Sequence, residues 1–179
     1  SSGPSGLHFG HYISGAADLE LAEFHRKMVH IPYISGYSPV RWQQGIDVML
    51  EKKKGNFRVT KLRAILLYES AFNQLNKKLG RDMMFTAERL QLVAKEQYGS
   101  RKGKAAIEQC LNKRLTFVLA RQLKRPLAMC SNEAKSCYDR IVHSVASLSM
   151  RRMGVEAEPI ICMVTTIQNL EHYIRTVYG

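Results

Sequence analysis

The sequence predicts a mixed α and β fold of the α+β class, in which a β-hairpin and two short strands accompany several helices. Three observations support this prediction. Strand-like runs at residues 46–51 and 57–67 flank a basic turn at 52–56, as in a hairpin. Longer segments repeat apolar residues at helical spacing. A length of 179 residues suits one domain, or one domain with a small subdomain.

Up to residue 119, the chain contains four segments with helical periodicity. The first covers residues 16–29, and we expect Pro32 and the turn-rich run at 36–39 to end it. Residues 69–79 and 85–95 follow the hairpin, with Gly80 closing the first of these two helices. A fourth helix follows the basic loop at 99–104. Its apolar face consists of Ile107, Cys110, Leu111, Leu115, Val118 and Leu119.

The second half begins with an apolar strand that Pro126 opens and that ends near Ser131. Residues 138–148 then place apolar side chains on one helical face, and Gly154 ends that helix. Pro159 opens another helix, which runs to about Leu170. A last strand is predicted at 173–178.

The composition indicates a basic protein with an anionic partner. The formal net charge is +12 and the isoelectric point is about 9.7, values that favour binding to polyanions such as RNA or DNA. A solvated basic surface without a specific partner is the alternative. The chain has neither an apolar run of the ~20 residues that span a bilayer nor a signal peptide at its start. We therefore expect an intracellular protein of the nucleus or an organelle, neither secreted nor bound to a membrane.

The four cysteines do not indicate a metal site or a disulfide. They lie at positions 110, 130, 137 and 162, without the paired spacing of a zinc site. The segments around Cys110 and Cys130 are apolar, so buried free thiols are expected there.

Two basic segments are candidates for phosphate contact. Strand alternation at 57–67 predicts that Lys61 and Arg63 project to the same side of the hairpin. Lysines at the hairpin tip either face phosphate or protect an edge strand from aggregation. In the loop at 99–104, Arg101, Lys102 and Lys104 lead into a helix whose first amides can hold a phosphate. The alternative there is a solvated first turn.

The most specific pattern is an apolar run at 127–131, an acid at Glu133, the pair Tyr138-Asp139 and then an amphipathic segment. The stretch from Glu133 through Asp139 to His143 resembles the palm motif D-x-x-x-A-F-D-x-V-x-H of retroelement reverse transcriptases, chiefly the non-LTR-like sequences of protist and algal type. Residues 96–103 are similar to the stretch Q-F-G-F-R-K-G of that family. Arg63-Ala64-Ile65 resembles its R-P-I segment.

This resemblance implies a fingers-like region at 1–125 and a partial palm at 126–179, with a fingers hairpin, helices and an incomplete palm sheet. It also implies roles for individual residues. Arg63, together with Lys61 or one of the lysines at 52–54, would contact the nucleotide triphosphate, and Tyr138 would lie under its sugar unless it is a core aromatic. Glu133 would be the catalytic carboxylate that binds Mg²⁺, unless it is only a solvated acid. The template path would be lined by Gln97, Gly99, Arg101 and Lys102.

Two departures from the family pattern predict that this chain does not polymerise DNA by itself. Glu133 replaces the usual Asp, which lengthens the side chain by ~1.5 Å. A misplacement of about 1 Å can cost on the order of 10²-fold in rate. The paired aspartates of the later palm are absent from the sequence. An incomplete sheet would leave the strand at 173–178 to pair with a protein partner or to remain poorly ordered.

Two functions remain compatible with these observations. One is a reverse-transcriptase-like fragment, an RNA-directed DNA polymerase by family, that binds nucleic acid. The other is a degenerate, domesticated retroelement fragment that serves as a structural or RNA-binding subunit of a larger assembly.

Overall fold

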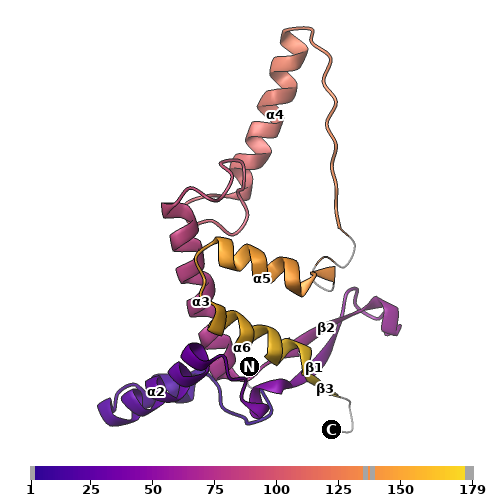
Figure 1. The fold of residues 1–179 in the computed structure, drawn as a ribbon. Coiled ribbons are helices and arrows are strands. Elements are labelled where there is room, and N and C mark those ends of the chain that lie inside the picture. Colours follow the sequence, from indigo (N-terminus) through magenta and orange to yellow (C-terminus); the bar gives the residue numbers. More distant parts are fainter. Residues whose placement is uncertain (1–2, 135–136, 138–139, 176–179) are drawn as a thin grey trace.

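The computed structural model describes residues 3–134, 137 and 140–175, and Figure 1 shows how its helices and strands are arranged. The helices of this part of the chain are α1 (Phe9–Gly15), α2 (Leu19–Ser35), α3 (Ser70–Arg89), α4 (Ala106–Gln122), α5 (His143–Arg152) and α6 (Ala157–Gln168). The strands are β1 (Gln44–Glu51), β2 (Leu62–Leu67) and β3 (Glu171–Ile174). Two short 3-10 turns, η1 (Val40–Gln43) and η2 (Val59–Lys61), precede β1 and β2. The mixed α and β class is therefore confirmed.

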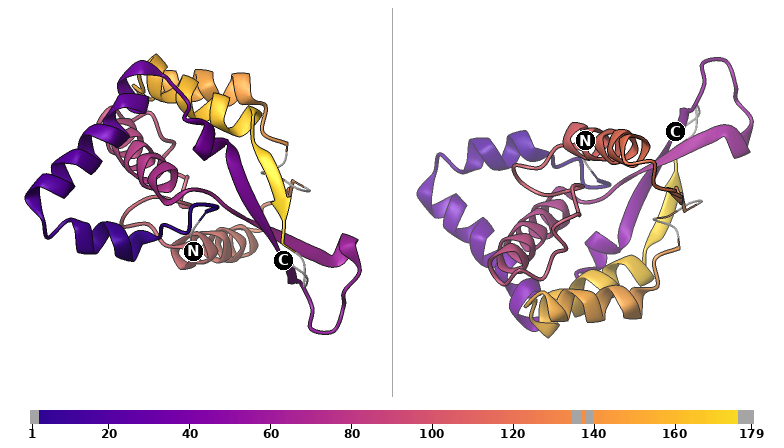
Figure 2. Two further views of the ribbon diagram at one scale, coloured as in Figure 1. Left: turned by 90° about the horizontal axis from the view of Figure 1, so that it is seen from below. Right: turned by 90° about the horizontal axis from the view of Figure 1, so that it is seen from above.

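The three strands form one sheet in the order β2-β1-β3, with β1 in the centre. β1 and β2 pair antiparallel from Ile46 opposite Leu67 to Glu51 opposite Leu62, which confirms the hairpin. β3 pairs with β1 in parallel, and the two strands lie side by side in both views of Figure 2. The expectation that residues 173–174 lack a partner within the chain is therefore wrong. The rest of that predicted strand, 176–178, lies outside the described residues.

The core lies where α3 and α6 meet the start of the sheet. Trp42, Phe72 and Cys162 are almost fully buried and pack together with Leu75. Burial raises the pKa of the Cys162 thiol, so this cysteine stays protonated near neutral pH. Because Cys162 belongs to α6 and Phe72 to α3, both halves of the chain contribute to one core.

The opening loop is fixed to the start of α3 by a buried carboxylate. The Glu69 side chain is fully buried and accepts hydrogen bonds from the Ser5 backbone N–H at 2.9 Å and the Ser5 hydroxyl at 2.7 Å. Ser70 Oγ donates to the Leu7 carbonyl at 2.7 Å. A side chain at Gly3 would have its Cβ 2.7 Å from the Glu69 backbone nitrogen, so only glycine fits this approach. These hydrogen bonds satisfy polar oxygens that burial would otherwise leave without a partner.

The run at 36–39 ends α2 as predicted, whereas Pro32 and Gly80 do not end a helix. α2 continues through Pro32 and ends at Ser35, where Gly36 has φ 72° and donates its N–H to the Pro32 carbonyl. Pro32 is buried, and this packing offsets the backbone hydrogen bond that a proline cannot donate. α3 runs without interruption through Gly80, because a glycine with helical dihedral angles weakens a helix without ending it.

The segment around α4 departs most from the prediction. α4 follows the predicted helix and projects from the other helices and the sheet (Figure 1). Its expected apolar face is exposed along its whole length. Residues 126–131 form no strand, since they find no ladder partner among the described residues, and all six are exposed. Cys110 and Cys130 are exposed too, so the expectation that they are buried is wrong. α5 begins at His143, after the position predicted from its apolar spacing.

We expect Gly80→Ala to raise the free energy of unfolding by about 0.5–1 kcal/mol, because alanine favours the helix and its Cβ would meet open space. Urea denaturation followed by circular dichroism measures this change. Gly154→Ala is the contrasting variant. Gly154 has φ +85°, and a Cβ there would lie 3.2 Å from Thr86 Cγ2, so alanine should destabilise by about 1 kcal/mol or more. Destabilisation by Gly80→Ala would contradict a continuous α3.

Candidate nucleic-acid interface

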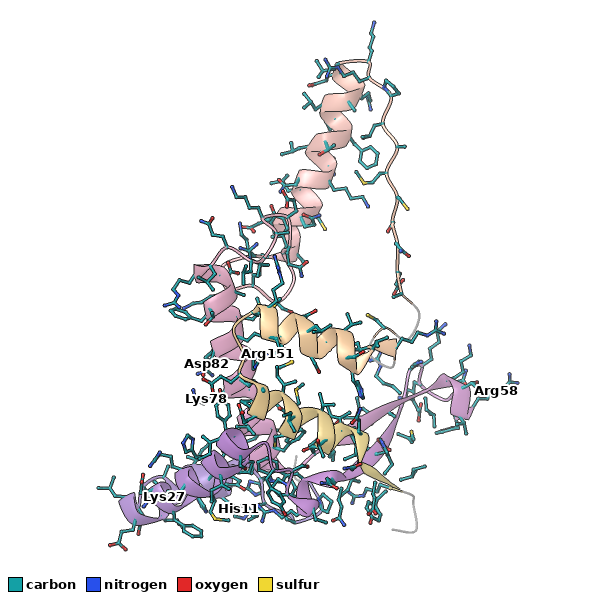
Figure 3. The ribbon with its side chains drawn as sticks, in the orientation of Figure 1. His11, Lys27, Arg58, Lys78, Asp82 and Arg151 are labelled. Atoms are coloured by element: carbon teal, nitrogen blue, oxygen red, sulfur yellow. The ribbon has the colours of Figure 1, made fainter. Side chains whose placement is uncertain are left out.

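The tip of the β1–β2 hairpin carries a concentrated group of exposed basic side chains. Figure 3 shows the hairpin projecting from the body, with Arg58 at its far end. Residues 51–63 contain six basic side chains and one acid, Glu51. All six basic residues are exposed and form no ion pair within the described part of the chain. They are Lys52, Lys53, Lys54, Arg58, Lys61 and Arg63.

The single acid of the tip shapes the turn and does not neutralise a cation. Glu51 Oε2 accepts a hydrogen bond of 2.6 Å from the Gly55 backbone N–H. Gly55 has φ +81°, a conformation that glycine adopts without steric cost. Asn56 adds a turn through its backbone N–H, which donates to the Lys53 carbonyl at 3.1 Å. The turn therefore holds the lysines outward while leaving their charges uncompensated.

Lys61 and Arg63 lie together at the entry to β2, although not through strand alternation. Lys61 ends the turn η2, and Arg63 is the second residue of β2, opposite Leu50 of β1. Both side chains are exposed. The pairing of Lys52 N–H with the Lys61 carbonyl, at 3.3 Å, brings Lys61 close to the lysines of the tip.

Arg101, predicted on the template path, is engaged by its own protein. Its Nε and Nη2 donate to the two carboxylate oxygens of Glu88, at 2.6 and 2.7 Å. Its Nη1 donates to the carbonyls of Ala94 at 2.7 Å and Gln97 at 3.2 Å. The side chain is only 11% exposed. These hydrogen bonds of the Arg101 guanidinium hold the loop between α3 and α4 against the end of α3. Hydrogen bonds between a guanidinium and a carboxylate are stronger than those between neutral groups.

The Arg101 hydrogen bonds lower the pKa of the Glu88 carboxyl and raise that of the guanidinium, so both groups stay charged over a wide pH range. Sequence reasoning missed Glu88. The two residues are 13 positions apart and belong to different elements, so no local spacing connects them.

The other predicted template residues lie in the same loop. Gln97 Nε2 donates to the Gly99 carbonyl at 3.2 Å, so these two residues form a local turn. Lys102 is exposed. Lys104 Nζ lies 5.3 Å from the centre of the Tyr98 ring, a distance that allows a cation–π interaction.

The structure does not gather a metal site around Glu133. Glu133 is exposed in a segment without regular structure, and Tyr138 lies outside the described residues. Among the residues that the structure describes, no three His, Cys, Asp or Glu side chains come together to hold a metal ion. Within the described residues, Glu133 therefore belongs to no cluster of three ligands that could hold Mg²⁺, and Asp139 lies outside those residues.

A buried carboxylate that the sequence did not single out lies in the sheet. Asp47 of β1 is almost buried, and its Oδ2 lies 2.8 Å from Nδ1 of His172 in β3. The Arg175 backbone N–H donates to the Asp47 carbonyl at 2.9 Å. The charge of Asp47 adds to burial in raising the pKa of Tyr68. These contacts join the last strand to the centre of the sheet.

Protein-family models, curated proteins and solved structures were compared with this chain, and none of the three comparisons finds a match. None of the helices described is both long and apolar enough to cross a membrane. The function therefore has to be inferred from the charge and geometry of the chain itself.

We expect Glu88→Gln to free the Arg101 side chain, because the variant loses the carboxylate to which the Arg101 guanidinium donates two hydrogen bonds. In ¹⁵N NMR, the Arg101 Nε–H signal should exchange rapidly with water in the variant and slowly in the parent protein. Glu96→Gln, in the same loop, is the matched control and should leave the signal unchanged.

Acid should also weaken this contact, which a change in the Arg101 ¹⁵Nε chemical shift during a pH titration would report. The pKa of Glu88 is lowered in the folded chain, so its contribution is complete above the usual value of 4.5 and is lost as the pH falls through the lowered pKa. Slow exchange of the Arg101 Nε–H in Glu88→Gln would contradict the contact.

Proposed function

We propose that this chain binds RNA through the basic tip of its β1–β2 hairpin, as a reverse-transcriptase-like fragment that does not polymerise DNA alone. The observation that carries the proposal is the group of six exposed basic side chains at residues 51–63 that have no acidic partner in the described structure. Cations without a partner at a protruding tip are free to contact phosphate without first breaking an internal ion pair.

Electrostatics favours a nucleic acid over other anions. A net charge of +12 raises the local concentration of polyanions around the whole chain. Arg58 and Arg63 add planar guanidinium groups, which bind phosphate oxygens in pairs. A hairpin tip is narrow enough to follow a strand backbone, and each phosphate that it neutralises releases a condensed counterion.

The family assignment is supported by the order of the elements and their motifs. An antiparallel hairpin with Arg63 in its second strand precedes the loop with Gln97, Arg101 and Lys102, and Glu133 follows α4. Within this reading Lys61 and Arg63 contact a triphosphate, and Gln97, Gly99 and Lys102 face a template. RNA as partner favours the nucleus or an organelle as the place of action.

A structural or RNA-binding subunit of a larger assembly is the second candidate, as a domesticated retroelement fragment. The Arg101 side chain is paired with Glu88 and is therefore occupied within the chain. Among the described residues, the exposed Glu133 lacks the other acids of a catalytic site. The side of β3 away from β1 faces no other described strand, so a protein partner could extend the sheet there.

We expect a fluorescently labelled single-stranded RNA to bind the chain with steep salt dependence. Lys53→Gln/Lys54→Gln should weaken binding by on the order of tenfold, because two phosphate contacts are lost. The log–log slope against salt should become shallower by about 1.4, at about 0.7 for each contact on a single strand. Fluorescence anisotropy at several salt concentrations measures both quantities.

Lys77→Gln/Lys113→Gln is the matched control for this experiment. Both lysines are exposed, form no ion pair in the described chain and lie outside the hairpin, and the variant has the same net charge. Equal losses in both double variants would show that only total charge matters. That outcome, or binding that salt does not change, would contradict the hairpin as the RNA site.

Primer extension on an RNA template with Mg²⁺ tests the enzymatic side of the proposal. We expect no extension by the parent chain or by Glu133→Asp, because shortening one exposed acid does not supply the other carboxylates. Extension by either form would show that this chain is a complete polymerase. If RNA binding is also absent, the reverse-transcriptase-like function is rejected altogether.

A further inference from the structure

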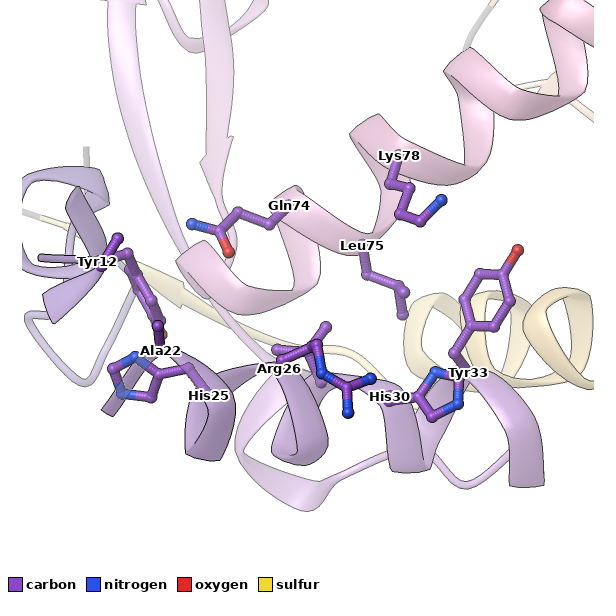
Figure 4. A pocket seen from close by; sticks show the side chains of 11 residues that line it. Tyr12, Ala22, His25, Arg26, His30, Tyr33, Gln74, Leu75 and Lys78 are labelled. Carbon is purple, nitrogen blue, oxygen red and sulfur yellow. The ribbon is translucent and has the colours of Figure 1, made fainter. Parts of the chain in front are cut away.

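A hollow of about 810 Å³ opens between α1, α2 and α3, away from the basic hairpin. Figure 4 shows it from close by, and Figure 3 shows α2, marked by Lys27, and the hairpin tip, marked by Arg58, at opposite ends of the molecule. The volume lies within the range of small-molecule sites, about 300–1,000 Å³. The hollow therefore has room for a ligand of its own, separate from the proposed RNA site.

The floor of the hollow is apolar and its walls carry flat rings. Leu75 of α3 is 5% exposed and lies below the opening, with Val29 of α2 beside it. The rings of His30 and Tyr33 are nearly parallel, 14° apart, with centroids separated by 6.4 Å. Such surfaces favour a flat, partly apolar ligand that stacks on rings.

Several polar groups of the lining have no partner within the described chain. These are the side chains of Tyr12, His25, His30, Tyr33 and Gln74, none of which forms a hydrogen bond to another described residue. Burial raises the pKa of Tyr12, so its phenol stays protonated and able to donate. The Gln74 amide offers both a donor and an acceptor. A ligand with hydrogen-bonding edges would satisfy groups that the protein leaves open.

The charges at the rim favour an anion. Arg26 and Lys78 both line the hollow, whereas no carboxylate does. Arg26 and Lys78 form ion pairs with Glu23 and Asp82, and neither acid lines the hollow. Arg26 uses Nε and Nη2 for Glu23, which leaves Nη1 free for another acceptor. Exposed ion pairs of this kind contribute little to stability, so a phosphate can compete for both cations.

We propose that this hollow binds a nucleotide, with the base stacked on the aromatic rings of the lining and the phosphate at Arg26 and Lys78. The planar base would pack on the apolar floor and the aromatic walls, and its polar edge would form hydrogen bonds with the Gln74 amide. The phosphate matches the two cations. The nucleotide is either free or one residue of an RNA strand. The proposal does not depend on RNA binding by the hairpin.

The test is an NMR titration that follows the ring C2–H signals of His25 and His30 during addition of AMP, adenosine, inorganic phosphate or an octamer of adenylate. We expect AMP or the octamer to shift both signals in a saturable way, at lower concentration than adenosine or phosphate alone. A response to AMP identifies a free nucleotide as ligand. A response to the octamer without one to AMP identifies a nucleotide within a strand.

Variants separate the hollow from the hairpin. Arg26→Gln/Lys78→Gln should weaken the responding ligand at least tenfold, as measured by calorimetry, whereas Lys27→Gln/Lys77→Gln, on the same helices but outside the lining, should change it less than twofold. For AMP, Lys53→Gln/Lys54→Gln should have no effect. The proposal is overturned if neither AMP nor the octamer shifts the histidine signals, or if both helix variants bind equally well.

Discussion

The structure depends on β1, the only strand of the described sheet with a partner on both sides. One edge of β1 fixes β2 and therefore the base of the hairpin, and the other fixes β3 and the end of the described chain. Asp47 strengthens the second contact through His172. Before β1, Ser38 Oγ lies 2.8 Å from Thr166 Oγ1 of α6, a buried hydrogen bond that holds α6 against the same region. Residues more than 100 positions apart are thereby joined.

This arrangement separates a rigid base from an open tip. The base of the hairpin is paired along six residue positions and leads through Tyr68 to the buried Glu69 and the core helix α3. Beyond the paired strands, the tip is held only by local hydrogen bonds such as that of Glu51 to Gly55. Repulsion among the cations is tolerated because water solvates each of them. A polyanion bound at the proposed site would relieve that repulsion.

Sequence patterns over a few residues predicted the elements whose structure is determined by residues close together in the sequence. Alternation and a basic turn identified the hairpin, and helical spacing identified α4 and α6. Pro32 and Gly80 do not end a helix as predicted, because tertiary packing overrides local helix propensity. The strand predicted at 126–131 does not form, because a strand needs a pairing partner, which apolar spacing alone cannot predict. The basic tip followed from composition. Neither the ion pair between Glu88 and Arg101 nor the hollow between three helices could be predicted from composition or spacing, because both arise from residues that only folding brings together.

The connection between the two basic surfaces is short and stiff, which bears on how they would act together. β2 ends at Leu67, and α3 begins three residues later with the helix that contributes Leu75 and Lys78 to the hollow. The buried Glu69 lies at this junction and also fixes the loop that leads to α1. The base of the hairpin and the helix that lines the hollow are therefore joined by a short segment that the contacts of Glu69 hold in place. If both proposed sites bind nucleic acid, a strand long enough to reach both would have a raised effective concentration at the second site once bound at the first, whereas a free nucleotide would gain nothing from the hairpin.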